Sequence, residues 1–140
     1  MRTYATLAIA LLLTAGGCAA APATEATSEA APATPFNVLG LEDAPVIIIE
    51  FTDLQCPYCA RFARQTFPQL RRNYIDTGRV RFASQDLPLP RHAFAVPAAV
   101  AARCAGEQGR FWEFREALFS AQAKLPNEPY ADLARQFGLD

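Results

Sequence analysis

The sequence predicts an α/β fold in which a parallel strand–helix–strand unit is followed by helices alone. Three observations indicate this class: a run of β-branched residues at 46–49, a helical period of apolar residues after it, and a short apolar strand after a glycine turn. Two strands with a helix between them, within roughly forty residues, are typical of a βαβ unit with parallel strands.

The strands are predicted from their side chains. Residues 36–41 are expected to form a short edge strand. Residues 46–51, Val-Ile-Ile-Ile-Glu-Phe, predict the clearest strand, because β-branched residues favour this conformation. The apolar run is continuous rather than alternating, so we expect both of its faces to be buried in the middle of a parallel sheet. A further strand is expected over residues 79–83.

The helix between these strands is predicted from apolar residues that recur at intervals of three and four positions, up to about Tyr74. Pro68 lies inside this stretch and should kink it. The predicted apolar face consists of Cys59, Phe62, Ala63, Thr66, Phe67, Leu70 and Tyr74.

Helices alone are predicted after the last strand. Pro88, Pro90 and Pro97 should interrupt the chain before the first of them. Pro129 should open the last helix and Gly138 should close it. The three expected helices cover residues 98–105, 110–121 and 129–138.

Cys104 shares one face of the first of these helices with Val96 and Val100, at a spacing of four. We expect it to be a small buried hydrophobic residue. The alternative is a second disulfide with a cysteine outside this sequence.

The predicted sheet is short of strands. A strand as apolar as residues 46–51 needs neighbours on both sides, and the sequence supplies two clear strands and one weaker candidate. We therefore expect the chain to be truncated, or to depend on something else to complete its sheet.

The first residues follow the three-part plan of an export signal: a basic start with Arg2, an apolar stretch over 4–15, and small residues before Cys18. The apolar stretch is far shorter than the roughly 20 residues that span a bilayer. We predict a lipoprotein-type signal peptide over residues 1–17, after which Cys18 is acylated. An ordinary signal peptide cleaved near residues 19–21 is the alternative. Export would place the domain in an oxidising compartment, where disulfides persist.

Residues 18–35 are predicted to be the lipidated cysteine and a tether. Positions 19–35 hold only Ala, Pro, Thr, Glu and Ser, so they have nothing to contribute to a core. The acyl chains would anchor the protein to a membrane surface. The formal net charge of the whole chain is -1, which gives no indication of a nucleic-acid partner.

The motif Cys56-Pro57-Tyr58-Cys59 lies where the predicted helix begins. Pro57 suits the first turn, which places Cys56 near the N-cap. The partial positive charge and unpaired N–H groups of a helix N-terminus stabilise a thiolate, which would make Cys56 a good nucleophile and leaving group. Cys59 lies one turn further on the same side, so a disulfide between the two is feasible. It faces the core and should be the less exposed of the two.

Other uses of the pair are less well supported. A structural zinc site needs four ligands, and only Cys104 and His92 remain as candidates, so no metal is expected. A structural disulfide across so small a loop would stabilise little. His92 lacks the partners of a cysteine-protease base and is expected to cap or pack at the start of the helical region. A redox role is therefore indicated.

The stretch APVIIIEFTDLQCPYCARF, residues 44–62, resembles the DsbA-like branch of the thioredoxin superfamily. Further matching motifs follow in order and extend the resemblance over nearly all of residues 37–140: PQL at 68–70, GRVRF at 78–82, DLPL at 86–89 followed by His92, AARCA at 101–105 and EQGRFWE at 107–113. The resemblance implies that residues 36–140 are an incomplete DsbA-like thioredoxin domain in which 91–140 form the helical insertion. The C-terminal ββα half, with its cis-proline loop, would be missing.

The resemblance also implies a function, that of a thiol–disulfide oxidoreductase of the cell envelope or periplasm, an oxidase rather than a reductase, with no cofactor. Cys56 would be the attacking, exposed cysteine, and Cys59 the resolving cysteine of the redox disulfide. Glu50 would be a proton acceptor beneath it; the alternative is a strand-end glutamate that faces solvent.

The implied partners are thiol-containing substrate proteins and a membrane partner that reoxidises or reduces the cysteine pair. Two alternatives stay open: a non-enzymatic envelope lipoprotein that binds a partner through its helical surface, and an inert fragment.

Overall fold

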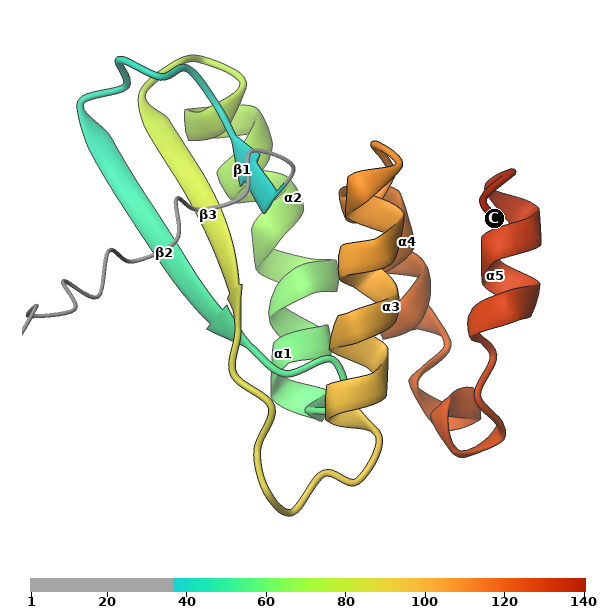
Figure 1. Ribbon diagram of the computed structural model, residues 1–140. Coiled ribbons are helices and arrows are strands. Elements are labelled where there is room, and N and C mark those ends of the chain that lie inside the picture. The colour runs from blue at the N-terminus through green and yellow to red at the C-terminus, as the bar shows by residue number, and fades with distance from the viewer. Residues whose placement is uncertain (1–36) are drawn as a thin grey trace, which may run out of the picture. The chain divides into compact units, whose positions relative to one another are not determined.

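The computed structural model describes residues 37–140 (Figure 1). The predicted signal peptide, Cys18 and the tether therefore lie outside the described residues. Within residues 37–140, no helix is both long enough and apolar enough to cross a membrane.

The sheet of the described part has three strands, β1 (Val38–Leu39), β2 (Val46–Thr52) and β3 (Val80–Asp86), in the order β1-β3-β2. β1 pairs with β3 in antiparallel fashion. β2 pairs with β3 in parallel along its whole length, in a register that runs from Val46 opposite Val80 to Thr52 opposite Asp86. The predicted strand–helix–strand unit with parallel strands is thereby confirmed.

β2 lies at the edge of this sheet, and the expected burial of both its faces is wrong for the described residues. The central strand is β3, whose residues from Phe82 to Ser84 are all buried. In β2, Ile47, Ile49 and Phe51 are 61%, 54% and 63% exposed. The helices cover the opposite face of the sheet (Figure 1), and these three side chains stay largely exposed.

A continuous helical run over residues 57–75 connects β2 to β3, as predicted, but its hydrogen bonding is not uniform. It consists of α1 (Pro57–Arg61), the π-helix η2 (Phe62–Thr66), α2 (Phe67–Leu70) and the π-helix η3 (Arg71–Ile75). Pro68 lies in the first turn of α2, directly after η2. Because proline has no N–H to donate, the wider turn before it satisfies the helix without a break. The kink predicted at Pro68 stays a prediction, and the structure shows the π turn η2 before this residue.

The remaining described elements are helical: α3 (Ala95–Glu107), α4 (Phe111–Ser120), the 3₁₀ helix η4 (Gln122–Asn127) and α5 (Tyr130–Gln136). All three predicted helices are present, and η4 was not predicted. Pro97 does not precede α3 but lies in its first turn, where a missing N–H costs nothing. Pro129 is the N-cap of α5, and Gly138 follows its end with a φ of +66°.

Two apolar clusters form the core. The larger one joins α3, α4 and α5 to the start of α1, with Ala60, Ala98, Leu118 and Leu125 all 0% exposed. The smaller one lies between the sheet and the 57–75 helical run, around Phe67 and Phe82. Trp112 packs against both clusters, and its ring stacks on Phe67 at a centroid distance of 5.6 Å. The helical region and the sheet therefore share one packed interior.

Candidate active site

Cys56 lies at the N-cap of α1, with an extended backbone (φ −73°, ψ 123°) and Pro57 as the next residue. Its N–H donates to the Asp53 carbonyl at 3.0 Å, and its carbonyl accepts from the Ala60 N–H at 3.1 Å. The turn that joins β2 to α1 therefore ends at this cysteine. The predicted place of Cys56 at the start of a helix is confirmed.

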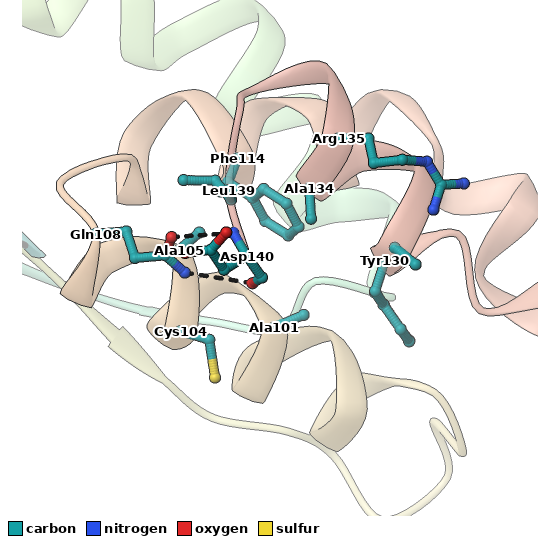
Figure 2. A pocket seen from close by; sticks show the side chains of 11 residues that line it. Ala101, Cys104, Ala105, Gln108, Phe114, Tyr130, Ala134, Arg135, Leu139 and Asp140 are labelled. Atoms are coloured by element: carbon teal, nitrogen blue, oxygen red, sulfur yellow. Dashed lines mark hydrogen bonds between the residues drawn. The ribbon is translucent and has the colours of Figure 1, made fainter.

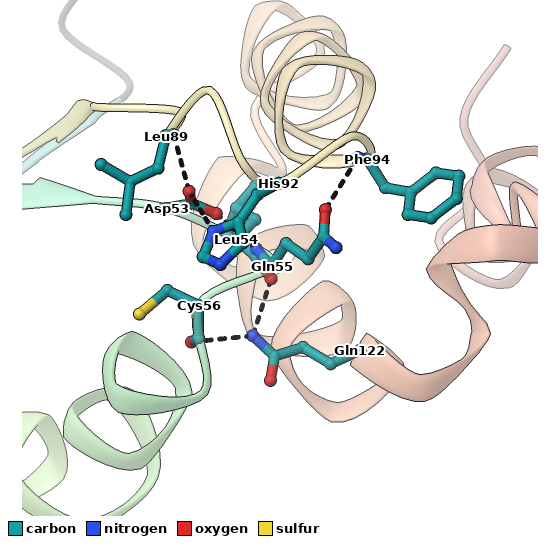
Figure 3. A network of polar contacts seen from close by, with 8 residues as sticks. All are labelled: Asp53, Leu54, Gln55, Cys56, Leu89, His92, Phe94 and Gln122. Atoms are coloured by element: carbon teal, nitrogen blue, oxygen red, sulfur yellow. Dashed lines mark hydrogen bonds and ion pairs between the residues drawn. The ribbon is translucent and has the colours of Figure 1, made fainter.

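Asp53 holds this turn in place (Figure 3). Its Oδ1 accepts from the Gln55 N–H at 2.8 Å, and its Oδ2 accepts from the Leu89 N–H at 2.8 Å. The Nδ1 of His92 lies 2.7 Å from the same Oδ2. The turn before Cys56 is thereby fastened to the segment that leads from β3 to α3.

Two glutamines complete the network around this turn. Gln55 Oε1 accepts from the Phe94 N–H at 2.7 Å, just before α3. Gln122 Nε2, from η4, donates to the Leu54 carbonyl at 2.8 Å and to the Cys56 carbonyl at 3.0 Å (Figure 3). The backbone of Cys56 is thus held by a side chain 66 residues further along the chain.

Sequence reasoning missed Asp53, Gln55 and Gln122 as positioning residues. A signal existed for Asp53, because an aspartate between a strand end and a helix start often caps the intervening turn with its carboxylate. Gln122 carried no such signal, since its partners lie far away in sequence. His92 was expected to cap or pack at the start of the helical region, and in the structure it pairs with Asp53 there.

Asp53 stays ionised although it is buried. Burial alone would raise the pKa of Asp53, but hydrogen bonds from Leu89, His92 and Gln55, together with the charge on His92, lower that pKa below its ordinary value. The carboxylate therefore keeps its hydrogen bonds over the whole range from mildly acidic to alkaline pH.

The two thiols of the pair differ from expectation in their exposure. Cys56 is buried, at 8%, whereas Cys59 is half-buried. The expectation that Cys56 is the exposed cysteine and Cys59 the less exposed one is therefore wrong for the described residues. The reason is that Cys59 faces a cavity at the edge of the sheet, whereas Cys56 lies in the closely held turn. Both sulfurs are free thiols in the structure.

Burial raises the pKa of the Cys59 thiol above its ordinary value. Its contacts with the Asp53 backbone and the Thr52 hydroxyl act in the opposite direction, and the neighbouring Cys56 raises the pKa further. Cys59 is thus held as a neutral thiol at neutral pH, and a nearby base would help to remove its proton.

The cavity beside Cys59 is mostly apolar. It opens between β2 and the first turns of the helical run. Its lining consists of Ile48, Glu50, Phe51, Tyr58, Cys59, Phe62 and Phe82. A cavity of this kind places one carboxylate and one thiol among apolar side chains at one opening of the surface.

Glu50 lines this cavity rather than facing solvent. Its side chain is 11% exposed, and its Oε2 lies 2.5 Å from the guanidinium of Arg115. The Ser84 hydroxyl donates to the same oxygen at 3.2 Å. The alternative of a solvent-facing strand-end glutamate is therefore wrong, and the structure brings Glu50 and Cys59 to one cavity.

Cys104 lies apart from this site and is exposed, so the expectation that it is buried is wrong. α3 buries its alanine face instead, and Val96 and Val100 on the side of Cys104 are more than half exposed. Cys104 borders a second cavity, between α3 and α5, that shares no residue with the first (Figure 2). Among residues 37–140, no three His, Cys, Asp or Glu side chains gather as a metal site would require.

A thioredoxin family model matches residues 33–140. Among curated proteins, "Disulfide bond formation protein D" of Bacillus subtilis is 34% identical over 92 residues, which are 65% of this chain and 41% of that protein. "Na(+)/H(+) antiporter NhaA 3" of Salinispora tropica is 37% identical over 105 residues, which are 74% of this chain and 16% of that protein. The chain thus corresponds to less than half the length of these curated relatives.

Solved structures also resemble this chain over part of their own length. Wolbachia pipientis alpha-DsbA1 is 27% identical, with a TM-score of 0.64, over 74% of this chain and 54% of that one. A thioredoxin-like oxidoreductase from Silicibacter pomeroyi is 33% identical, with a TM-score of 0.61, over 74% of this chain and 57% of that one. The sheet, the helical run and the helical region described above therefore have counterparts in proteins of this kind.

Proposed function

This chain belongs to the DsbA-like branch of the thioredoxin family, and from this premise we propose that it exchanges disulfides with substrate proteins through Cys56 and Cys59. The observation that carries the proposal is the placement of Cys56 at the N-cap of the helix that leaves β2, one turn before Cys59. Two cysteines one helical turn apart are close enough for a disulfide to form between them.

In the proposed reaction, a substrate thiolate attacks the sulfur of Cys56 in the Cys56–Cys59 disulfide. A mixed disulfide forms between the substrate and Cys56, and Cys59 leaves as a thiolate that takes up a proton. The second thiolate of the substrate then attacks the substrate sulfur of the mixed disulfide. The substrate leaves oxidised, and the protein keeps two thiols.

Glu50 is proposed as the proton acceptor for Cys59 when the pair is reoxidised, or when the reaction runs toward reduction. In either case Cys59 must lose its proton before its sulfur attacks the mixed disulfide. Burial raises the pKa of this thiol, so the step benefits from a base, and Glu50 is the carboxylate that lines the same cavity.

The oxidase direction is proposed in preference to the reductase direction. A curated relative that is named for disulfide bond formation supports it. The measurement that decides is the reduction potential of the pair: roughly −120 mV is typical of strong oxidants such as DsbA, and −270 mV of the reductant thioredoxin.

We further propose that the domain works in the cell envelope, anchored through an acylated Cys18 that follows a signal peptide over residues 1–17. Residues 18–35 would then form the tether, and a membrane partner would reoxidise the pair. Loss of membrane association in Cys18→Ser, with unchanged export, is the result that this anchoring requires.

The proposed activity is tested by Cys56→Ser in an assay that follows reduction of insulin. Exchange should be abolished, because the attacking sulfur is absent. Cys104→Ser is the matched control, since it removes an exposed thiol that does not line the cavity at Cys59. Insulin reduction that survives Cys56→Ser would refute the assignment.

A further inference from the structure

We propose that Arg115 is a positioning residue of the Cys56–Cys59 redox centre, which holds the Glu50 carboxylate at the cavity beside Cys59 and supplies the buried positive charge there. The inference rests on the proposed function. Arg115 comes from α4, within the helical region, whereas Glu50 comes from β2. The helical region would thereby act on the redox pair through one ion pair.

The ion pair between Arg115 and Glu50 is buried, and its two charged groups are close together. The side chain of Arg115 is 1% exposed, and its terminal NH2 nitrogen lies 2.5 Å from Glu50 Oε2. The two residues are 65 positions apart in the chain, so tertiary packing alone brings them together. Charges this far from water interact strongly, because little solvent screens them.

The rest of the guanidinium is enclosed by aromatic rings. Its Cζ lies 5.5 Å from the centroids of Phe67 and Trp112 and 4.8 Å from that of Phe119. Its Nε and its other terminal nitrogen have no hydrogen-bond partner among the described residues. Glu50 is therefore the one carboxylate that forms an ion pair with Arg115 in the described part of the chain.

The charge of Arg115 lies next to Glu50, which lines the same cavity as Cys59. Burial lowers the pKa of Arg115, while the negative charges of Glu50, Glu116 and an ionised Cys59 act in the opposite direction. These are the titratable groups that act on the guanidinium. By reciprocity, the guanidinium stabilises negative charge on the sulfur as well as on Glu50.

This arrangement bears on the redox equilibrium. When two glutathione thiols reduce the Cys56–Cys59 disulfide, glutathione disulfide and the protein dithiol form; at alkaline pH, where Cys59 loses its proton, a thiolate and the Glu50 carboxylate then share one cavity. With Arg115 present, its positive charge offsets the repulsion between the two negative charges. Without it, the reduced form loses stability and the disulfide is favoured.

The test measures the equilibrium constant for reduction of the full chain by glutathione at an alkaline pH at which Cys59 is ionised, in wild type and in Arg115→Met. The variant keeps most of the side-chain length but removes the charge. We expect its constant to fall by at least about five-fold. Arg115→Lys, which keeps the charge, should stay closer to wild type. Arg110→Met is the matched control, because Arg110 precedes the same helix, is exposed and pairs with Glu113 at the surface.

A second pair of variants covers the case in which Arg115→Met leaves Glu50 unpaired and fails to fold. Glu50→Gln keeps Arg115 and removes the carboxylate, and Glu50→Gln with Arg115→Met removes both charges. The constant of the double variant should be lower than that of Glu50→Gln alone, because only the latter retains the guanidinium that stabilises the thiolate.

The outcomes separate the inference from the proposed function. The role of Arg115 is overturned if Arg115→Met has the same constant as wild type and the double variant has the same constant as Glu50→Gln. It is also overturned if Arg115→Met and Arg115→Lys lower the constant equally. Either result leaves the redox function standing. A wild-type protein that forms no Cys56–Cys59 disulfide at any glutathione ratio would instead refute the proposed function.

Discussion

At the scale of single residues, the carboxylate of Asp53 determines the shape of the turn before Cys56. It accepts hydrogen bonds from two backbone N–H groups, those of Gln55 and Leu89, and it pairs with His92. The Asp53 residue itself is 3% exposed. A buried carboxylate with its hydrogen bonds satisfied stabilises the fold, whereas its removal would leave donors unpaired.

We expect Asp53→Asn to lower the free energy of unfolding at pH 7 by about 1.5–3 kcal/mol, because the hydrogen bonds that it loses or weakens involve a charged group. Urea denaturation measures this difference. Asp132→Asn is the control: its side chain is 74% exposed beside Arg135, so it should change stability by less than about 0.5 kcal/mol.

The contribution of Asp53 should also depend on pH. Its pKa in the folded protein is lowered from an ordinary value of 3.8, so its stabilising effect is fully present above that value. The effect is lost as the pH falls below 3.8 and through the lower pKa of the folded state, because the unfolded state takes up a proton more readily than the folded state. The stability gap between wild type and Asp53→Asn should therefore narrow as the pH falls below 3.8; a gap that widens there would contradict this.

At the scale of elements, α3 is defined by its small residues. Ala95, Ala98, Ala102 and Ala105 are each at most 2% exposed, and the last three belong to the core cluster that joins the helices. Their small side chains allow α3 and α4 to approach closely (Figure 1). The opposite side of α3 carries larger apolar residues that stay exposed, so size rather than hydrophobicity decides which face is buried.

Ala98→Leu should destabilise the protein by about 1–3 kcal/mol, since a fully buried site has no space for three further carbon atoms. The control is Val100→Leu on the exposed side of the same helix, which should have little effect because Val100 is 55% exposed. Thermal or urea unfolding of both variants checks the difference. Equal losses would mean that both faces of α3 are packed.

At the scale of the whole molecule, the sheet has one covered face and one open face. Ile47, Ile49 and Phe51 form an apolar row on the open face of β2, and each is more than half exposed. Apolar rows of this kind normally mark a surface that something covers. In the described residues, however, all the helices lie on the other face (Figure 1).

Ile49→Thr tests whether this row is solvated in the chain itself. Threonine keeps the β-branched shape, so the strand should persist and the free energy of unfolding should change by less than about 0.5 kcal/mol. Binding of a fluorescent hydrophobic dye such as ANS should decrease. A loss of more than about 2 kcal/mol would instead show that the row is covered in solution, and sedimentation would then reveal whether a second copy covers it.

Local features of the sequence predicted the elements of this fold. β-branched residues identified β2, the spacing of apolar residues identified the helical run, and proline and glycine marked the limits of α5. The place of Cys56 at a helix start was predicted for the same reason, since proline in a first turn is a local preference.

Burial could not be predicted in this way. Both faces of β2 and the side chain of Cys104 were expected to be buried, but one face of β2 and Cys104 are exposed, and the order of exposure of Cys56 and Cys59 is reversed. Each of these outcomes depends on which distant element lies opposite a side chain. An apolar residue carries the same hydrophobicity whether or not a partner covers it.

The sequence by itself determined the order of strands and helices and placed the two thiols one turn apart, because these properties depend on neighbours a few residues away. Only the tertiary structure decided which charges surround those thiols. Asp53 meets His92 across 39 positions, and Glu50 meets Arg115 across 65. The electrostatic environment of a site depends on distances in space, and only the packing of the elements sets them.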